Sequence, residues 1–300
     1  MEGILQWGID LIIAVQKFRT PFLDTFFMNI SALGGDVYYF LIFSFLFWCV
    51  DDRETARFTV LFCLSFWINS ELKRFFGQPR PYDLAPELKV GYCSGGGGLP
   101  SYHAQGSFLF WGYLSFWFKR VPLYVFSVII VFLIALSRIY LGHHFPTDIL
   151  GGWLISFTLL CVFYLSYHKI EERLKKTGFY AKILIAFSVP VILTFIKPSS
   201  WTIGAMGFLA GFGTGYCVLK EFIAFNTAGG FLNKLLRYLT GIAGLFAVYY
   251  GLSYLFSVEG RLVFWILLFI KFMLMGLWMS AGAPWVFTKL GLVKNNTPGV

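Results

Sequence analysis

Nine long apolar segments, separated by short polar ones, restrict what this chain of 300 residues can fold into. Most of them approach the roughly 20 residues that an α-helix needs to cross the hydrocarbon core of a bilayer. A helix can cross lipid because it satisfies its own backbone hydrogen bonds. The sequence therefore predicts an all-α, polytopic membrane helix bundle with about nine transmembrane helices. They cover residues 37–50, 55–76, 102–118, 121–141, 147–167, 179–196, 202–219, 238–256 and 262–281.

The composition agrees with a membrane protein and excludes other classes. Hydrophobic residues make up 58% of the chain and charged residues 13%, whereas soluble domains carry roughly 25% charged residues. The aromatic content of 21% excludes a disordered chain. The formal net charge of +9 does not indicate nucleic acid, because no run of Lys or Arg exceeds two residues. We expect the lipid bilayer as a partner and no nucleic acid; the oligomeric state stays open.

The cations between the apolar segments predict an orientation, because loops rich in Lys and Arg stay in the cytoplasm. The richer side faces the cytoplasm, so the N-terminus faces outward and the C-terminus inward. We expect a bacterial inner membrane. The richer set is Arg53, Arg57, Lys119, Arg120, Lys169, Arg173, Lys175, Lys176, Lys220, Lys234, Arg237, Lys289 and Lys294; the other set is Lys17, Arg19, Lys89, Lys197 and Arg261, together with the cations of the three polar blocks described next.

Three polar blocks, at residues 73–81, 100–103 and 137–148, lie at outward ends of apolar segments. Lys73, Arg80 and Arg138 are cations that could meet phosphate oxygens. Ser101 can cap the helix that follows it and donate to the same anion. The free backbone N–H groups there, including that of Tyr102, suit an anion as well. Taken singly, the cations could equally be interfacial side chains and the serine a plain cap.

The third block also contains a candidate nucleophile. His144 and Asp148 are four residues apart, so they share one helix face. The carboxylate would fix the imidazole tautomer, and the neutral imidazole could then attack phosphorus and form a phosphohistidine. His103 could protonate the leaving oxygen and later deprotonate water. Two-metal catalysis needs clustered carboxylates, and Asp83 and Glu87 beside Asp148 show no such clustering, so we expect no metal and no cofactor.

The spacings Lys-x6-Arg-Pro, Pro-Ser-x-His and Ser-Arg-x5-His-x3-Asp resemble the three signature motifs of the type-2 phosphatidic acid phosphatase superfamily. That superfamily includes vanadium haloperoxidases and glucose-6-phosphatase, and the predicted nine spans resemble the latter. The resemblance implies a helical membrane bundle with an outward-facing site. It implies phosphate binding by Lys73, Arg80, Ser101 and Arg138, with His103 as acid/base, His144 as nucleophile and Asp148 as its partner.

One residue departs from the motif pattern. Tyr102 stands where the second motif normally has glycine, which puts rate and substrate choice in doubt more than reaction class. His143, next to the nucleophile, would point elsewhere on a helix, and we expect it at the rim of the site. The run Gly95–Gly98 predicts either a mobile flap over the site or a plain flexible connector.

The remaining predictions concern the regions of the chain. Residues 1–36 are expected to form interfacial helices, of which the first is amphipathic and either lies on the bilayer or packs on the bundle. Residues 37–170 would form the catalytic membrane core of five helices, and residues 171–300 a membrane extension of four. Lys271, deep in the last segment, is expected to pair with Glu71, Asn69 or a carbonyl.

These observations predict a metal-independent phosphatase that hydrolyses a lipid phosphate monoester or diphosphate at the outer membrane face through a phosphohistidine. A lipid substrate could reach the site laterally at the depth of the headgroups. The alternatives are a phosphatase for a soluble sugar phosphate, like glucose-6-phosphatase, and a lipid phosphotransferase. A lipid transporter or flippase would be a protein of a different class, and its function would not require the complete set of histidines, cations and aspartate described above.

Overall fold

The computed structural model describes residues 2–93, 95–196, 198–253 and 260–293, and within them the secondary structure is helical, with no strand. The chain divides into two compact units. Unit 1 combines Met1–Tyr39 with Leu64–Tyr167, and unit 2 combines Phe40–Cys63 with His168–Val300. The division expected from the sequence, into residues 1–36, 37–170 and 171–300, stays a prediction.

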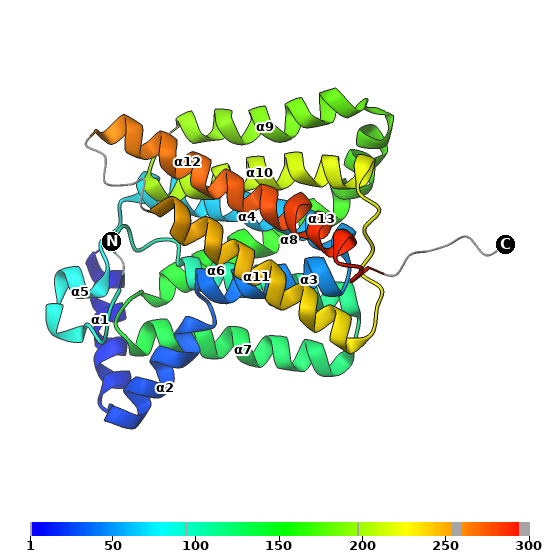
Figure 1. Ribbon diagram of the computed structural model, residues 1–300. Coiled ribbons are helices and arrows are strands. Elements are labelled where there is room, and N and C mark those ends of the chain that lie inside the picture. Colours follow the sequence, from blue (N-terminus) through cyan, green and yellow to red (C-terminus); the bar gives the residue numbers. More distant parts are fainter. Residues whose placement is uncertain (1, 94, 197, 254–259, 294–300) are drawn as a thin grey trace. The chain divides into compact units, whose positions relative to one another are not determined.

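Figure 1 shows the helices along the chain. Several begin with the expected local signals: the Thr20 hydroxyl accepts from the Leu23 amide at the first turn of α2, and α7 and α8 have proline in their first turn. The helices are α1 Glu2–Gln16, α2 Pro21–Ala32, α3 Asp36–Cys49, α4 Asp52–Phe76, α5 Pro81–Leu84, η1 Pro86–Leu88, α6 Tyr102–Phe118, α7 Val121–Tyr140, α8 Pro146–Lys176, α9 Phe179–Ile196, α10 Ser200–Phe222, α11 Phe231–Ser253, α12 Arg261–Leu277, η3 Trp278–Gly282 and α13 Ala283–Lys289.

All nine predicted segments contain helix, but nine spans are not confirmed. Six helices in the described part are long and apolar enough to cross a membrane: α7, α8, α9, α10, α11, and α12 with its continuation to Lys289. A seventh span results if α2 and α3, which meet at a 45° bend, count as one. The other two fall short for physical reasons. Helix α6 has 17 residues, and α4 carries charged residues in both its first and last turns.

Two cations in the orientation argument, Lys197 and Lys294, lie outside the described residues. A third, Arg237, is fully buried in unit 2. Its guanidinium donates to the backbone oxygens of Leu292, Ala228 and Asn226. It therefore ties the end of α13 to the connection between α10 and α11 instead of facing water at the membrane surface.

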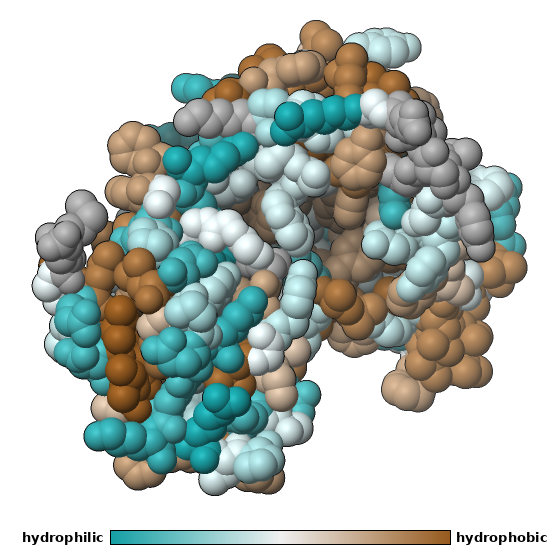
Figure 2. All heavy atoms as spheres, turned by 90° about the vertical axis from the view of Figure 1, so that its left-hand side faces the viewer, coloured by the Kyte–Doolittle hydropathy of each residue, from teal (hydrophilic) through white to brown (hydrophobic). Residues whose placement is uncertain are grey.

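The N-terminal helix α1 packs on the rest of unit 1. Ile12 is fully buried against Leu88 and Phe145. The Gln16 amide donates to the backbone oxygens of Leu88 and Tyr140, both at 2.8 Å. Helix α1 therefore packs on unit 1, while Ile4, Trp7 and Ile13 remain exposed, and contact of α1 with the bilayer stays a prediction. In Figure 2, hydrophilic residues gather beside hydrophobic ones on the face that carries α1 and α5.

A buried polar network holds α4 against α6 inside unit 1. The Asn69 amide donates to the Gln105 side-chain oxygen at 2.8 Å, and the Gln105 amide donates to the Ser65 hydroxyl at 2.8 Å. The Ser156 hydroxyl of α8 donates to the Gln105 backbone oxygen at 2.6 Å. Because buried polar groups are costly when unpaired, this network fixes the register of three helices.

In unit 2, α10 and α12 approach closely through small residues. A Cβ atom on Gly207 would lie 2.6 Å from the Phe269 backbone oxygen. Gly211 faces the backbone of Met273, and Gly276 faces the backbone of Phe208. The four-residue spacing of glycines in α10 thus allows the two backbones to meet, as small-residue motifs do in membrane helices.

Lys271 of α12 has two partners that were not predicted. Its ammonium donates to the Ser253 hydroxyl at 2.8 Å and lies 3.6 Å from the centre of the Tyr249 ring. Two of the predicted partners are engaged elsewhere: Glu71 pairs with Arg74, and Asn69 belongs to the network above. The cation is stabilised by α11, one helix away in sequence, through a hydroxyl and an aromatic face.

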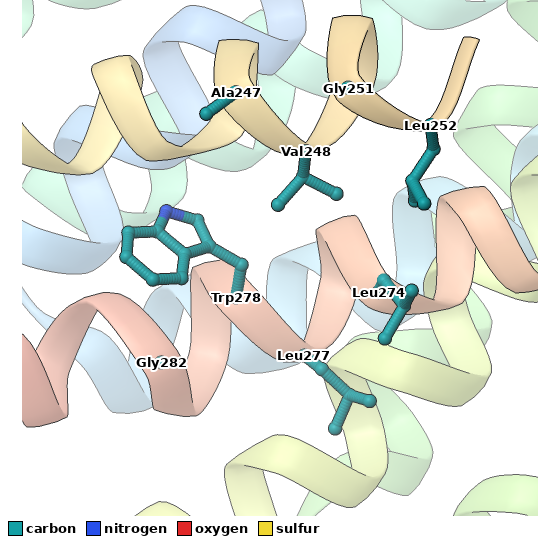
Figure 3. A pocket seen from close by; sticks show the side chains of 8 residues that line it. All are labelled: Ala247, Val248, Gly251, Leu252, Leu274, Leu277, Trp278 and Gly282. Carbon is teal, nitrogen blue, oxygen red and sulfur yellow. The ribbon is translucent and has the colours of Figure 1, made fainter. Parts of the chain in front are cut away.

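Unit 2 also contains an apolar groove of about 590 Å³ between α11 and α12 (Figure 3). None of the predicted site residues lines it. The lining residues are Ala247, Val248, Gly251, Leu252, Leu274, Leu277, Trp278 and Gly282.

Candidate active site

The three polar blocks meet at one end of unit 1, where several helices begin or end. Lys73 lies in the last turn of α4, and Arg138 in the last turn of α7. Ser101 is the N-cap of α6, and Asp148 lies in the first turn of α8. The Ser101 amide donates to the Asp148 backbone oxygen at 2.9 Å, which joins the second block to the third.

The predicted His144–Asp148 pair is formed. The His144 Nδ1 atom lies 3.1 Å from Asp148 Oδ2, and the two side chains are 2% and 0% exposed. The same carboxylate oxygen accepts from the Phe145 amide at 3.0 Å. The other oxygen, Oδ1, accepts from the Gln78 side-chain amide at 2.7 Å. Both oxygens of Asp148 are thus held by hydrogen-bond partners.

The surroundings of His144 keep its imidazole neutral. This residue lies in the connection between α7 and α8. Burial lowers its pKa well below the ordinary value, and the charges of Lys73, Arg80 and Arg138 lower it further. A neutral imidazole whose Nδ1–H donates to Asp148 has its lone pair on Nε2. That nitrogen is therefore available as a nucleophile.

The cations of the first block face the glycine run. Lys73 Nζ donates to the backbone oxygens of Gly97 and Gly98 at 2.7 and 3.2 Å. Arg80 Nε donates to the Gly96 oxygen at 2.8 Å. The Gly98 amide donates back to the Gln78 oxygen at 2.8 Å. The glycine run therefore borders the site directly, and the choice between a mobile flap and a plain connector stays a prediction.

Gly98 also explains why a glycine is needed in this run. A Cβ atom there would lie 2.9 Å from the Pro79 backbone oxygen and 3.1 Å from Asp148 Oδ2. A Cβ on Gly95 would meet nothing within 4 Å. The close approach of the backbone to the Asp148 carboxylate thus excludes a side chain at position 98, and a Cβ atom on Gly97 would lie 2.8 Å from the Lys73 backbone oxygen.

Two donors at the site have no hydrogen-bond partner among the described residues. The guanidinium of Arg138 donates to the Ser31 hydroxyl and lies 3.7 Å from Cys93 Sγ, while its Nε atom is buried with no hydrogen-bond partner. The Ser101 hydroxyl is likewise buried without one. Buried polar atoms are normally satisfied. Two unsatisfied donors beside three cations suit an anion with several oxygens, such as phosphate.

His103 and Tyr102 share the first turn of α6 but have different surroundings. The positive charges of Lys73, Arg80 and Arg138 disfavour a proton on the imidazole of His103. A proton on His103 would in turn disfavour one on His144. Tyr102 turns toward α3 and α4, where its side chain hydrogen-bonds Asp36 and its ring meets that of Phe66 at 5.0 Å.

His143 is not the rim residue that we expected. It is 2% exposed, and its Nε2 atom lies 2.9 Å from the Val90 backbone oxygen. Burial and the charge of Arg138 lower its pKa to about 3. The connection between α7 and α8 is a turn and not a continuous helix, so neighbouring side chains need not point apart by a helical angle. His143 anchors the segment that leads into the glycine run.

Sequence reasoning missed three side chains that contact the site. Gln78 holds Asp148. Cys93 Sγ lies 2.9 Å from an Arg80 guanidinium nitrogen, and Ser31 of α2 contacts Arg138. Gln78 lies inside the first block and could have been suspected there. Cys93 and Ser31 have no spacing signal, because distant segments bring them to the site. Within the described residues, no group of three or more His, Cys, Asp or Glu residues could hold a metal ion.

Comparisons with known proteins identify a family and several relatives. The PAP2 superfamily profile matches residues 54–172, and a profile for the transmembrane extension of PAP2 superfamily phosphatases matches residues 203–295. A probable sphingosine-1-phosphate phosphatase of Dictyostelium discoideum is 28% identical over 65% of this chain and 51% of its own length. A lipid A 4'-phosphatase of Bacteroides thetaiotaomicron is 28% identical over 58% of this chain and 83% of its own.

The chain spans about half the length of the sphingosine-1-phosphate phosphatase that it matches. Among solved structures, the transmembrane PAP2-type phosphatidylglycerolphosphate phosphatase of Bacillus subtilis aligns with a TM-score of 0.46 at 20% identity, over 57% of this chain and 88% of its own. The two profiles together cover the three polar blocks and most of the membrane region that follows them. The chain is an integral membrane protein and belongs to the PAP2 superfamily.

Proposed function

We propose that this protein is a phosphatase that hydrolyses a lipid phosphate monoester or diphosphate at the outer membrane face. The observation that carries the proposal is the buried His144–Asp148 pair, with Nδ1 and Oδ2 3.1 Å apart, among three cations. The cations supply charge for the phosphate, and the pair supplies an oriented neutral nucleophile.

In the first step, the Nε2 lone pair of His144 attacks phosphorus, and the bond from phosphorus to the leaving oxygen breaks. His103, which can hold a proton once the anionic phosphate offsets the surrounding cations, donates that proton to the leaving oxygen as the alcohol departs. Asp148 stabilises the positive charge that develops on the imidazole. Lys73, Arg80 and Arg138 offset the charge on the equatorial oxygens, where the backbone N–H groups at the start of α6 add further donors.

In the second step, His103 removes a proton from water, and the water oxygen attacks phosphorus from the side opposite Nε2. The phosphorus–nitrogen bond breaks, its electrons return to Nε2, and inorganic phosphate leaves. His103 is then protonated again, and His144 is neutral, as at the start. Every proton and electron pair is accounted for without a metal ion.

A lipid substrate is favoured over a soluble one because the relatives are named for lipid phosphates, sphingosine 1-phosphate and lipid A. We also propose the outward orientation of the site and of the N-terminus, supported by the distribution of cations. Phosphatidate, phosphatidylglycerophosphate and polyprenyl phosphates belong to the same chemical class.

The test is phosphate release by the purified protein in detergent from sphingosine 1-phosphate, phosphatidate and glucose 6-phosphate. We expect release from the lipids, and we expect His144→Ala to reduce it by more than about 1,000-fold, as loss of a nucleophile does. His168→Ala removes an exposed histidine of α8 and should retain wild-type activity. Full activity of His144→Ala would refute the mechanism, and release from glucose 6-phosphate alone would refute the substrate class.

Metal independence has its own test. We expect the rate to stay unchanged when the protein is dialysed against excess EDTA, because the carboxylate at the site, Asp148, is engaged by His144, Phe145 and Gln78. A rate that falls under EDTA and returns with magnesium would contradict the proposed chemistry.

A further inference from the structure

Gln78 joins the first polar block to the third in a way that the signature motifs do not express. Its side-chain amide donates to Asp148 Oδ1 at 2.7 Å, and its backbone oxygen accepts from the Gly98 amide at 2.8 Å. The side chain is half-buried. Gln78 lies between Lys73 and Arg80 in sequence, yet its side chain points to the carboxylate and not to the place for phosphate that those cations define.

The Asp148 carboxylate is held at both ends. Oδ2 receives the His144 and Phe145 N–H groups at 3.1 and 3.0 Å, and both of these donors belong to the third block. Oδ1 receives Gln78, the donor from outside that block. Without Gln78, only the two donors to Oδ2 would oppose rotation of the Asp148 carboxylate about its last side-chain bond. Because His144 is hydrogen-bonded to Oδ2, a rotated carboxylate would also turn the imidazole.

We infer that Gln78 is a positioning residue for the reaction: its amide fixes the Asp148 carboxylate and thereby holds His144 Nε2 in line with phosphorus. The inference rests on the proposed phosphatase mechanism. The donor to Oδ1 acts on the nucleophile and leaves the phosphate-binding cations in place. Its loss therefore affects the transition state, in which the nucleophile bonds to phosphorus, and not the binding of the ground-state substrate.

The experiment compares Gln78→Met with Gln6→Met. Methionine keeps the length of the side chain and removes the donor. Gln6 donates to Asp10 Oδ1 at 3.0 Å on an exposed face of α1, so it offers a glutamine–aspartate hydrogen bond of the same type away from the site. We expect Gln78→Met to lower kcat about 10- to 100-fold, as loss of an orienting partner does, with KM within about 2-fold. Gln6→Met should change neither.

Inhibition separates positioning from a folding defect. Vanadate adopts the five-coordinate geometry of the transition state when a nucleophile bonds to it, whereas inorganic phosphate binds as the ground state. We expect the inhibition constant of vanadate to rise in Gln78→Met by the same factor as kcat falls, while that of phosphate stays within about 2-fold. A protein that is merely less folded has fewer active molecules, so its kcat falls with no change in either constant.

The possible results distinguish the role of Gln78 from the proposed function. A kcat of Gln78→Met within 2-fold of wild type, or a fall in kcat with an unchanged vanadate constant, overturns the role of Gln78. Wild-type protein that releases no phosphate, or His144→Ala protein that remains fully active, overturns the proposed function instead. Return of kcat and vanadate affinity in Gln78→Arg, which restores a donor, would support the hydrogen bond itself as the cause.

Discussion

At the scale of single residues, the donors of the site are partly used by the protein and partly open. Arg138 illustrates this: one terminal nitrogen donates to Ser31, the other faces Cys93, and Nε has no partner within the part of the chain that the structure describes. The contacts on the terminal nitrogens hold the guanidinium plane in place, so that binding an anion requires little further ordering of the side chain. Preorganised donors of this kind stabilise developing charge without reorganisation.

Gly98 provides a test of how closely the glycine run must approach Asp148. We expect Gly98→Ala to lower kcat about 10-fold or more, because its Cβ would press on Pro79 O and Asp148 Oδ2 and displace the carboxylate. Gly95→Ala is the matched control, since its Cβ would meet nothing within 4 Å. Phosphate release from a lipid phosphate measures both. Equal activity of the two variants would show that the run does not lie against the carboxylate in solution.

His143 predicts a pH dependence of stability. Its pKa is about 3 in the folded protein and about 6.5 in an unfolded chain. Between these values the unfolded chain binds a proton that the folded protein does not. The stability that depends on the neutral imidazole is therefore complete above pH 6.5 and is lost as the pH falls toward 3. At pH 5 this loss amounts to about 2 kcal/mol.

His143→Gln tests this dependence. In the wild type, the Val90 backbone oxygen accepts from His143 Nε2. The glutamine side chain can still donate to that oxygen, but glutamine does not titrate in this pH range. We expect the fall in melting temperature between pH 7 and pH 5, measured in detergent, to be smaller for His143→Gln than for the wild type. The same fall in both proteins would show that another group is responsible.

Contacts between single side chains could be predicted from the sequence where the two residues lie close together along the chain. The four-residue interval between His144 and Asp148 predicted a contact that the structure contains, but not by sharing a helix face, because His144 lies in the turn before α8 begins at Pro146. Gln78 had no comparable signal, because its contact with Asp148 spans 70 positions and depends on how α4 and α8 meet. The burial of His143 was also hidden, since the sequence does not reveal that α7 ends at Tyr140 and a turn follows.

At the scale of helices, the long apolar segments were the most predictable feature. Hydrophobic length alone identified α7 to α12, and these are the helices that satisfy the criteria for spans. Helices α3, α4 and α6 were also predicted to span the membrane, but each alone is too short or too charged for a span, and α3 counts only together with α2. Short helices such as α5 and η1 escaped prediction because the segment between α4 and α6 lacks a periodic apolar pattern.

The contact between α10 and α12 yields a prediction for stability. We expect Gly207→Ala to lower the melting temperature, at a cost of about 1 to 3 kcal/mol, because its Cβ would lie 2.6 Å from the Phe269 backbone oxygen and neither backbone can yield cheaply. Gly251→Ala in α11 meets nothing within 4 Å and should be neutral or stabilising by up to about 1 kcal/mol. Thermal unfolding in detergent compares them, and equal melting temperatures would contradict the close approach.

At the scale of the whole molecule, the orientation in the membrane decides which side the substrate comes from. Helix α7 has 20 residues and so measures about 30 Å, the thickness of the hydrocarbon core. Lys89 lies at the Tyr140 end of α7, since the adjacent Leu88 and Val90 bond to residues 16 and 141 there. Arg120 caps the opposite end. Both side chains are exposed.

Cysteines placed at these two positions therefore report the orientation directly. In a variant without the five native cysteines, we expect Lys89→Cys to react with a membrane-impermeant maleimide in intact spheroplasts, and Arg120→Cys to react only after the membrane is opened, because the cation-rich side faces the cytoplasm. The reverse pattern would keep α7 as a span but place the site inside, overturning the outward orientation. Reaction of both positions in intact spheroplasts would show that α7 does not cross. The comparison does not depend on whether six, seven or nine helices span the membrane, since it uses one helix and its two ends.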